Sequence, residues 1–273
     1  MNMNDVYKRG LVLLGCGKMG SAMLEGWLGN GMPATSVWII DPHPSDWVQG
    51  LVADGMHLNT DLPATPAIVL VAVKPQMMAE ALPSLTPLGN GSTLFISVAA
   101  GTPMSFYEAT LGANTPIVRA MPNTPAAVLR GITALIGNGK TGEPELALAE
   151  TLLQAVGQTV RLEDESQIDA VTGVSGSGPA YVFLMIEAMA AAGVAQGLAP
   201  QLAMKLAKAT VGGAGQLAEM AGEDPAQLRV NVTSPQGTTA AALEVLMDAQ
   251  SGLTPLVVRA VAAAAARSRE LSK

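Results

Sequence analysis

The first half of the chain alternates short apolar runs with segments of helical periodicity. Runs expected to form buried strands occur at 11–14, 36–40, 56–58, 67–73, 92–98, 116–119, 131–136 and 158–162. The run at 67–73 is continuously β-branched and aliphatic, as in a strand covered on both faces. Strands that alternate with helices predict a mostly parallel, doubly wound sheet, whose ligands lie outside the carboxyl ends of the strands.

From about residue 163 the strand runs stop and alanine-rich helical segments follow. Helices are expected at 168–195, 200–220, 225–232, 237–249 and 254–271, after one at 145–155. The chain is therefore predicted to have an α/β domain over 1–162 and an all-α domain over 163–273. Helices with alanine faces pack closely, which favours an intertwined dimer bundle over a helical domain that closes on itself.

A glycine turn follows the first apolar run. The sequence Leu-Gly-Cys-Gly-Lys-Met-Gly ends at Gly20, and an amphipathic segment follows at 21–28. Gly15 allows a tight turn, Gly17 lets the backbone approach a pyrophosphate, and Gly20 lets the helix pack against the strand. The bare N–H groups of the helix's first turn would hold the phosphates. The order strand, turn, helix predicts a Rossmann-type dinucleotide site, and the alternative is a glycine-rich turn in an α/β core.

Asp41 ends the second expected strand, 21 residues after Gly20. A carboxylate at about this place often accepts hydrogen bonds from the adenosine ribose and repels a 2′-phosphate, which would favour NADH. The alternative is a turn aspartate, because the sequence Asp-Pro-His-Pro that begins here is turn-forming. The sequence leaves both interpretations, and the preference for NADPH or NADH, open.

Three polar segments are candidates for the rest of a site. Within 172–181, Gly176 and Gly178 free the backbone so that N–H groups can converge on an anion. Within 231–240, Thr238 and Thr239 open a helix with hydroxyls and bare N–H groups. These two segments predict a carboxylate-binding pocket, with ordinary helix capping as the alternative.

The third segment, 119–126, reads Arg-Ala-Met-Pro-Asn-Thr-Pro-Ala, so that two prolines brace a short polar stretch. It is interpreted as a wall of the nicotinamide pocket, with a rigid surface loop as the alternative.

Composition excludes several other classes of function. The 273 residues carry a net charge of −7 without a basic cluster, so no nucleic-acid partner is expected. The two histidines, His43 and His57, have no spacing for a zinc site, and no metal is expected. The single cysteine, Cys16, forbids an internal disulfide and fits a reducing cytoplasm.

No membrane partner is expected either. The apolar stretch 182–195 is too short for a span and is interrupted by Glu187 and Gly193. The first residues contain no signal-peptide core, which again indicates a cytoplasmic protein.

Six segments together resemble the pyrroline-5-carboxylate reductase family, over nearly the whole chain. They lie at 14–20, 72–75, 97–101, 121–125, 171–181 and 231–239, and the last two are the most specific. The resemblance implies a Rossmann-type N-terminal domain and a helical C-terminal domain that interlocks with its partner's, so that two subunits build each active site. It also implies an oxidoreductase that reduces a cyclic imine carboxylate, 1-pyrroline-5-carboxylate, to L-proline with NADPH or NADH, as the last step of proline biosynthesis.

The resemblance also implies roles for individual residues. The cofactor is expected to lie against Gly15, Cys16, Gly17, Lys18, Met19, Gly20, Asp41, Asn59, Ala72, Val73, Lys74, Pro75, Val98, Ala99, Ala100 and Asn231. The substrate is expected at Glu165, Ser175, Gly176, Ser177, Gly178, Thr238 and Thr239. The Thr239 hydroxyl is the candidate catalytic group, bonding the imine nitrogen. Gln236 stands where the family often has glycine, and we expect this change to be tolerated.

Two rival functions remain for comparison. A 3-hydroxyacid-type dehydrogenase would need a lysine on the helix after the glycine-rich segment, but 179–187 contains none and the next is Lys205. A non-catalytic dinucleotide sensor would bind the cofactor without turnover, although the sequence contains no second recognition module.

Overall fold

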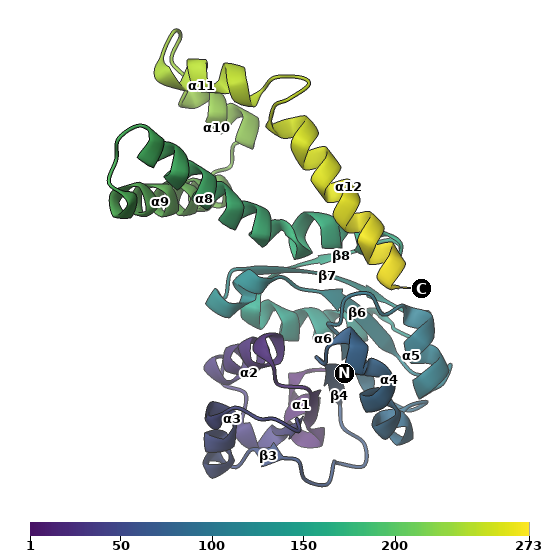
Figure 1. Ribbon diagram of the computed structural model, residues 1–273. Helices are drawn as coiled ribbons and strands as arrows, with labels where there is room; N and C mark the ends of the chain where they lie inside the picture. Colours follow the sequence, from purple (N-terminus) through teal and green to yellow (C-terminus); the bar gives the residue numbers. More distant parts are fainter. Residues whose placement is uncertain (273) are drawn as a thin grey trace. The chain divides into compact units, whose positions relative to one another are not determined.

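The computed structural model describes residues 1–272, which fall into two compact units. The first comprises Met1–Gly176 together with the residues from Ala264 onward, and the second is Ser177–Ala263. Each unit is described here by itself (Figure 1). The division into compact units lies elsewhere than the expected domain boundary near residue 163, because the first helical residues after the sheet pack with the sheet. The boundary between functional domains remains a prediction.

The first unit is built on a sheet with the strand order β3-β2-β1-β4-β5-β6-β7-β8. Its strands are β1 (Leu11–Leu14), β2 (Val37–Ile40), β3 (His57–Leu58), β4 (Ile68–Val71), β5 (Leu94–Ser97), β6 (Ile117–Met121), β7 (Gly131–Gly137) and β8 (Gly157–Arg161). All neighbours pair in parallel except β6 and β7, so β7 and β8 run opposite to the other strands. The predicted, mostly parallel sheet is confirmed, with each expected strand found near its expected place.

Helices cover both faces of this sheet, as the continuously apolar strands require. Leu11 and Leu13 point to one face and Val12 to the other, each into its own hydrophobic cluster. On the first face lie α1 (Met3–Arg9), α2 (Lys18–Gly29), α3 (Asp46–Gly50) and α6 (Glu143–Leu153). On the second lie α4 (Met78–Ala81) and α5 (Met104–Leu111). The indole N–H of Trp27 donates to the carbonyl of Leu152 at 2.9 Å and joins α2 to α6.

The later part of the described chain is helical, as predicted. It contains α7 (Gln167–Val171), the π-helical turn η7 (Thr172–Gly176), α8 (Gly178–Ala195), α9 (Pro200–Met220), α10 (Pro225–Asn231), α11 (Thr238–Leu246) and α12 (Leu253–Leu271). The polar segment 172–181 is therefore mainly helical, with one π-helical turn at its start.

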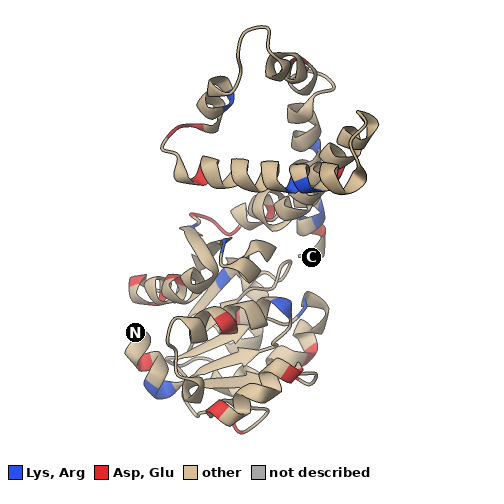
Figure 2. Ribbon diagram, turned by 90° about the vertical axis from the view of Figure 1, so that its left-hand side faces the viewer, with Lys and Arg blue, Asp and Glu red and all other residues tan. Residues whose placement is uncertain are grey.

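The second unit has a small core of its own. Ala190, Ala203 and Ala207 form a cluster between α8 and α9. Much larger side chains remain exposed, with Phe183 57% and Leu184 64% accessible. These helices carry few charged residues, as Figure 2 shows. Such an apolar, uncovered surface marks an interface with another molecule.

The helix expected at 168–195 is confirmed, and it extends well beyond the apolar stretch 182–195 that was judged too short to span a membrane. The helical run Gln167–Ala195 has 29 residues and a mean hydropathy of 1.5 in its most apolar window, so by length and composition it could cross a membrane. The residues before 182 continue the same helical run through α7 and η7. Because 6% of the residues in its most apolar window are buried, the apolar surface of this helix is available to a partner.

Candidate active site

The glycine turn after β1 has the geometry that a dinucleotide requires. Gly15 has φ +87°, a conformation that favours glycine, and its N–H donates to the Ile40 carbonyl at 2.8 Å. A Cβ atom on Gly20 would lie 2.4 Å from the carbonyl oxygen of Gly15, so α2 packs directly on the turn. A Cβ on Gly17 would meet nothing within 4 Å. Two of the three glycines therefore serve close packing, and the middle one faces open space.

The residues present fit a pyrophosphate. Gly17 is the N-cap of α2, and no side chain in the described part of the protein caps the helix there. The N–H groups of the first turn, from Lys18 and Met19, therefore remain for an anion beside an open backbone. This arrangement favours dinucleotide binding over a merely structural glycine turn.

Asp41 closes the same turn from β2. One carboxylate oxygen accepts the Cys16 N–H at 2.7 Å, and the other accepts the His43 N–H at 2.8 Å. Asn59 holds the Asp41 backbone, because its amide oxygen accepts the Asp41 N–H at 3.0 Å and its amide nitrogen donates to the Asp41 carbonyl at 2.8 Å. These contacts support the interpretation of Asp41 as a structural turn residue, while its contact with the ribose stays a prediction.

The sheet brings most of the expected cofactor residues to one edge. Because β1, β4 and β5 are parallel neighbours, the glycine turn, 72–75 and 98–100 all lie at carboxyl ends. The Ala72 N–H donates to the Leu14 carbonyl at 2.8 Å, and the Val98 N–H donates to the Val71 carbonyl at 3.0 Å. Asn231 belongs to the second unit, where it bonds Gln227 and Glu223.

Glu165 is held by a buried arginine. Its Oε1 accepts both a guanidinium N–H of Arg119 and the backbone N–H of Met104, the latter at 2.7 Å. Arg119 is 6% exposed within β6, whereas the Glu165 side chain is 38% exposed. A pocket of about 420 Å³ opens beside this pair, with Asp164 and Asp169 also in its wall. The pair fixes the orientation of an accessible carboxylate.

A buried phenol lies next to this pair. The Tyr107 hydroxyl hydrogen-bonds the Ser97 hydroxyl at the end of β5. Burial raises the pKa of Tyr107, opposed by hydrogen bonds to Ser97 and Thr102 and by the charge of Arg119. Tyr107 therefore remains neutral near pH 7 and acts as a hydrogen-bonding support under the cofactor edge.

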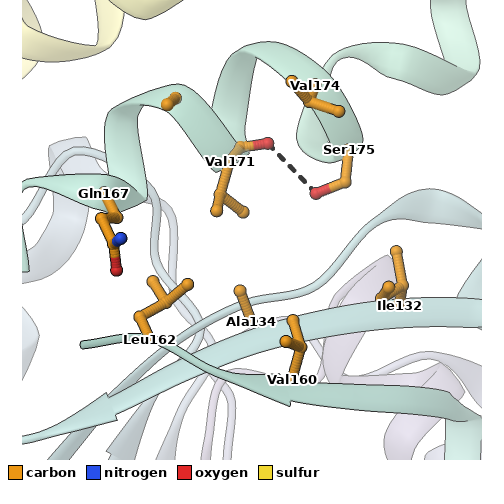
Figure 3. A pocket seen from close by; sticks show the side chains of 9 residues that line it. Ile132, Ala134, Val160, Leu162, Gln167, Val171, Val174 and Ser175 are labelled. Atoms are coloured by element: carbon orange, nitrogen blue, oxygen red, sulfur yellow. Dashed lines mark hydrogen bonds between the residues drawn. The ribbon is translucent and has the colours of Figure 1, made fainter. Parts of the chain in front are cut away.

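The substrate segment meets the sheet at η7. The amide of Asn123 donates to the Ser175 carbonyl at 3.2 Å, and the Ser175 hydroxyl donates to the Val171 carbonyl at 3.1 Å. A cavity of about 370 Å³ lies beside this turn, and its wall is almost entirely apolar (Figure 3). Side chains from α7 and η7 face Ile132 and Val160 of the strands across it. This cavity offers packing surface, so the candidate polar groups are the backbone of η7 and the carboxylate of Glu165.

The remaining expected substrate residues belong to the second unit. Ser177 and Gly178 open α8, while Thr238 and Thr239 form the first turn of α11. No side chain of the described residues caps α11, so its first N–H groups remain for an acceptor. Gln236 has φ +60°, in the left-handed region, which explains why glycine suits this position.

Two residues of the 119–126 segment were not identified individually from the sequence. The signal for Arg119 was a charged residue within an apolar strand, which implies a buried partner. The signal for Asn123 was a polar side chain between two prolines. Their partners, Glu165 and Ser175, lie 46 and 52 positions away.

Comparison with known proteins identifies both halves. Residues 10–101 match the family model described as NADP oxidoreductase coenzyme F420-dependent, and residues 165–271 match the model described as pyrroline-5-carboxylate reductase dimerisation. The second match indicates that the exposed apolar helices contact another copy of this chain. The expected homo-oligomer is thus confirmed, and the long apolar helix Gln167–Ala195 lies within the matched dimerisation region.

Whole-length relatives carry the same name. The pyrroline-5-carboxylate reductase of Pseudomonas aeruginosa is 39% identical over 266 residues, which are 96% of this chain and 97% of that protein. The Pisum sativum enzyme is 36% identical, with 99% and 98% covered.

Solved structures agree with these relatives. The Coxiella burnetii pyrroline-5-carboxylate reductase superposes with a TM-score of 0.90 at 34% identity, covering 97% of this chain and 99% of that one. The Plasmodium falciparum enzyme with NADP bound gives 0.83 at 27% identity, covering 98% and 99%. This chain belongs to the pyrroline-5-carboxylate reductase family and is a soluble, NAD(P)H-dependent oxidoreductase.

Proposed function

We propose that this chain reduces 1-pyrroline-5-carboxylate to L-proline with NADPH or NADH, the last step of proline biosynthesis. The observation that carries the proposal is the likeness to named pyrroline-5-carboxylate reductases over 96% or more of the chain, joined to the uncapped glycine turn. The 3-hydroxyacid-type dehydrogenase and the non-catalytic sensor have no comparable support.

The cofactor would lie along the carboxyl edge of the sheet. The first-turn N–H groups of α2 would bind its pyrophosphate, and 72–75 and 98–100 would line its nicotinamide half. When bound, the cofactor supplies a hydride to the imine carbon. Asp41 already accepts two backbone N–H groups, but each carboxylate oxygen can accept a second donor, so a ribose contact is compatible with this geometry.

The residues around the substrate would orient it more than exchange protons with it. Backbone N–H groups of Ser175–Gly178, and those of Thr238 and Thr239, would bind the substrate carboxylate. The Thr239 hydroxyl would hydrogen-bond the ring nitrogen, which must be protonated to accept a hydride well. Such orientation is worth several kcal/mol by effective-molarity arguments, and it requires no histidine.

Glu165 would contribute its second oxygen at the substrate side. Its Oε1 is taken by Arg119 and Met104, which leaves Oε2 to face the ring nitrogen or a water molecule next to it. A fixed carboxylate there favours the protonated, electrophilic imine. We also propose that the enzyme works in the cytoplasm, consistent with a single, unpaired cysteine.

Steady-state oxidation of NADPH and of NADH with pyrroline-5-carboxylate tests this proposal. Turnover with formation of L-proline is expected, and the ratio of the two kcat/KM values measures cofactor preference. Binding of both cofactors without turnover would overturn the proposal and favour the sensor.

A further inference from the structure

We infer that Asn123 is a positioning residue for the substrate loop. Its side chain hydrogen-bonds the segment after β6 to η7, and so fixes the position of the backbone of η7, which is proposed to bind the substrate carboxylate. This inference rests on the proposed function, because it concerns the binding of the same substrate.

The first observation concerns the hydrogen-bond partners of the Asn123 side chain. Asn123 is the N-cap of a 3₁₀ helix, η5 (Thr124–Val128), a position where asparagine usually bonds the helix's own N–H groups. Here it makes no such bond. Its amide nitrogen donates instead to the Ser175 carbonyl at 3.2 Å, and its amide oxygen accepts the Ile132 N–H at 3.0 Å. One side chain therefore joins three separate segments of the first unit.

The second observation is the nature of the segment that it holds. Ser175 lies in η7, a π-helical turn, and such turns are rare and frequent at functional sites. The adjacent Gly176 lies against β6, because a Cβ atom there would be 2.5 Å from Cε of Met121. The turn is thus supported by β6 and by the loop that follows it.

Burial makes this bond consequential. Asn123 is 9% exposed, so water cannot readily replace a lost partner. The Ile132 N–H of β7 holds the Asn123 side chain in place. Without the amide donor of Asn123, the Ser175 carbonyl loses its hydrogen bond to this fixed side chain, and the N–H groups of the same turn are no longer held at a fixed position. A shift of about 1 Å at a binding group is enough to weaken binding or catalysis by one to two orders of magnitude.

The test uses Asn123→Asp, which keeps an oxygen for the Ile132 N–H and replaces the donor to Ser175 by a second oxygen. The expected result is an increase of about tenfold in the KM for pyrroline-5-carboxylate, as for a lost hydrogen bond of about 1.4 kcal/mol. The KM for the cofactor should stay within about twofold. Asn123→Ala removes both bonds and is expected to raise the same KM at least as much.

Asn138→Ala is the matched control. Asn138 is also 9% exposed and also braces a loop, since it donates to the Thr115 carbonyl at 3.0 Å and accepts the Ile117 N–H at 3.2 Å. It should lower the unfolding temperature without changing either KM.

The outcomes separate the inference from the proposed function. If the unaltered protein shows no turnover, the proposed function fails and the inference fails with it. If it turns over, an unchanged substrate KM in both Asn123 variants overturns the inference alone. Equal increases in Asn123→Asp and Asn138→Ala, or an equal rise in the cofactor KM, would also overturn it, because they indicate a general loss of structure. A variant that does not fold leaves the other Asn123 variant to decide.

Discussion

Replacing Asp41 by asparagine separates two roles of one carboxylate. In the structure its oxygens accept the N–H groups of Cys16 at 2.7 Å and of His43 at 2.8 Å. An asparagine has the same shape but only one acceptor oxygen. Whichever way its amide is turned, one backbone N–H then faces an NH₂ donor. The substitution also removes the negative charge that would repel a 2′-phosphate.

The size of the stability effect follows from this geometry. Each hydrogen bond to the buried carboxylate is worth about 1.5–3 kcal/mol, because it involves a charged acceptor. One of the two bonds is lost and one donor is left facing another, so the expected loss is about 2–4 kcal/mol. For a protein of this size that corresponds to a fall in Tm of roughly 5–10 °C.

Two assays measure the two roles. Thermal unfolding of Asp41→Asn is compared with that of Asp46→Asn, which alters an exposed carboxylate nearby at the start of α3. Initial rates with NADPH and NADH then give the ratio of kcat/KM values for each variant. We expect Asp41→Asn to lower Tm and to raise the ratio in favour of NADPH, while Asp46→Asn changes the cofactor ratio little.

Each result can refute one part of the reasoning. A Tm equal to that of the Asp46 variant would show that the bonds to Cys16 and His43 contribute little. A lower Tm with an unchanged cofactor ratio would show that Asp41 serves the turn and does not contact the ribose.

Four further outcomes are expected. Thr239→Ala should lower kcat/KM about tenfold to a hundredfold, as for a lost charge-assisted bond of about 1.4–3 kcal/mol, and wild-type kinetics would exclude Thr239 from the mechanism. Gly20→Ala should abolish cofactor binding, measured by fluorescence titration, because its Cβ would lie 2.4 Å from the Gly15 carbonyl oxygen. Gln236→Gly should raise Tm by a few degrees, since the left-handed conformation costs a non-glycine residue about 1–2 kcal/mol. Burial raises the pKa of the Cys16 thiol, so its reactive thiolate form becomes abundant only at a higher pH than in free cysteine. Alkylation of Cys16 in the folded protein, measured as a function of pH, should therefore be slower than that of free cysteine at each pH.

Local patterns predicted most of the secondary structure. The apolar runs around 11–14 and 67–73 are strands, and the helix Pro200–Met220 begins and ends where its periodicity and proline indicated. The helices α1 and α5 were not identified. Both are short, and α5 is stabilised by packing of Tyr107 and Leu111 against the sheet more than by a clear local pattern.

In the candidate site too, some residues could be recognised from local sequence and others could not. The glycine turn could be recognised because its residues are contiguous in the sequence. Gly15 and Gly20 have the turn and packing roles expected from their spacing, while the approach of a pyrophosphate to Gly17 stays a prediction. The supports of the site could not be recognised, because Arg119 and Asn123 act through partners on other elements. The sequence leaves Asp41 ambiguous, since a turn residue and a ribose acceptor need the same side chain at the same place.

The sequence by itself determined most of the strands and helices and the family that the chain resembles, and it predicted a dinucleotide site at the glycine turn. These properties depend on residues that are neighbours along the chain, through periodicity, turn chemistry and motif spacing. The tertiary structure decided that β7 pairs antiparallel to β6, that Arg119 holds Glu165, and that Asn123 reaches Ser175. Those contacts join residues that only the folded sheet brings within hydrogen-bonding distance, so no local pattern could specify them.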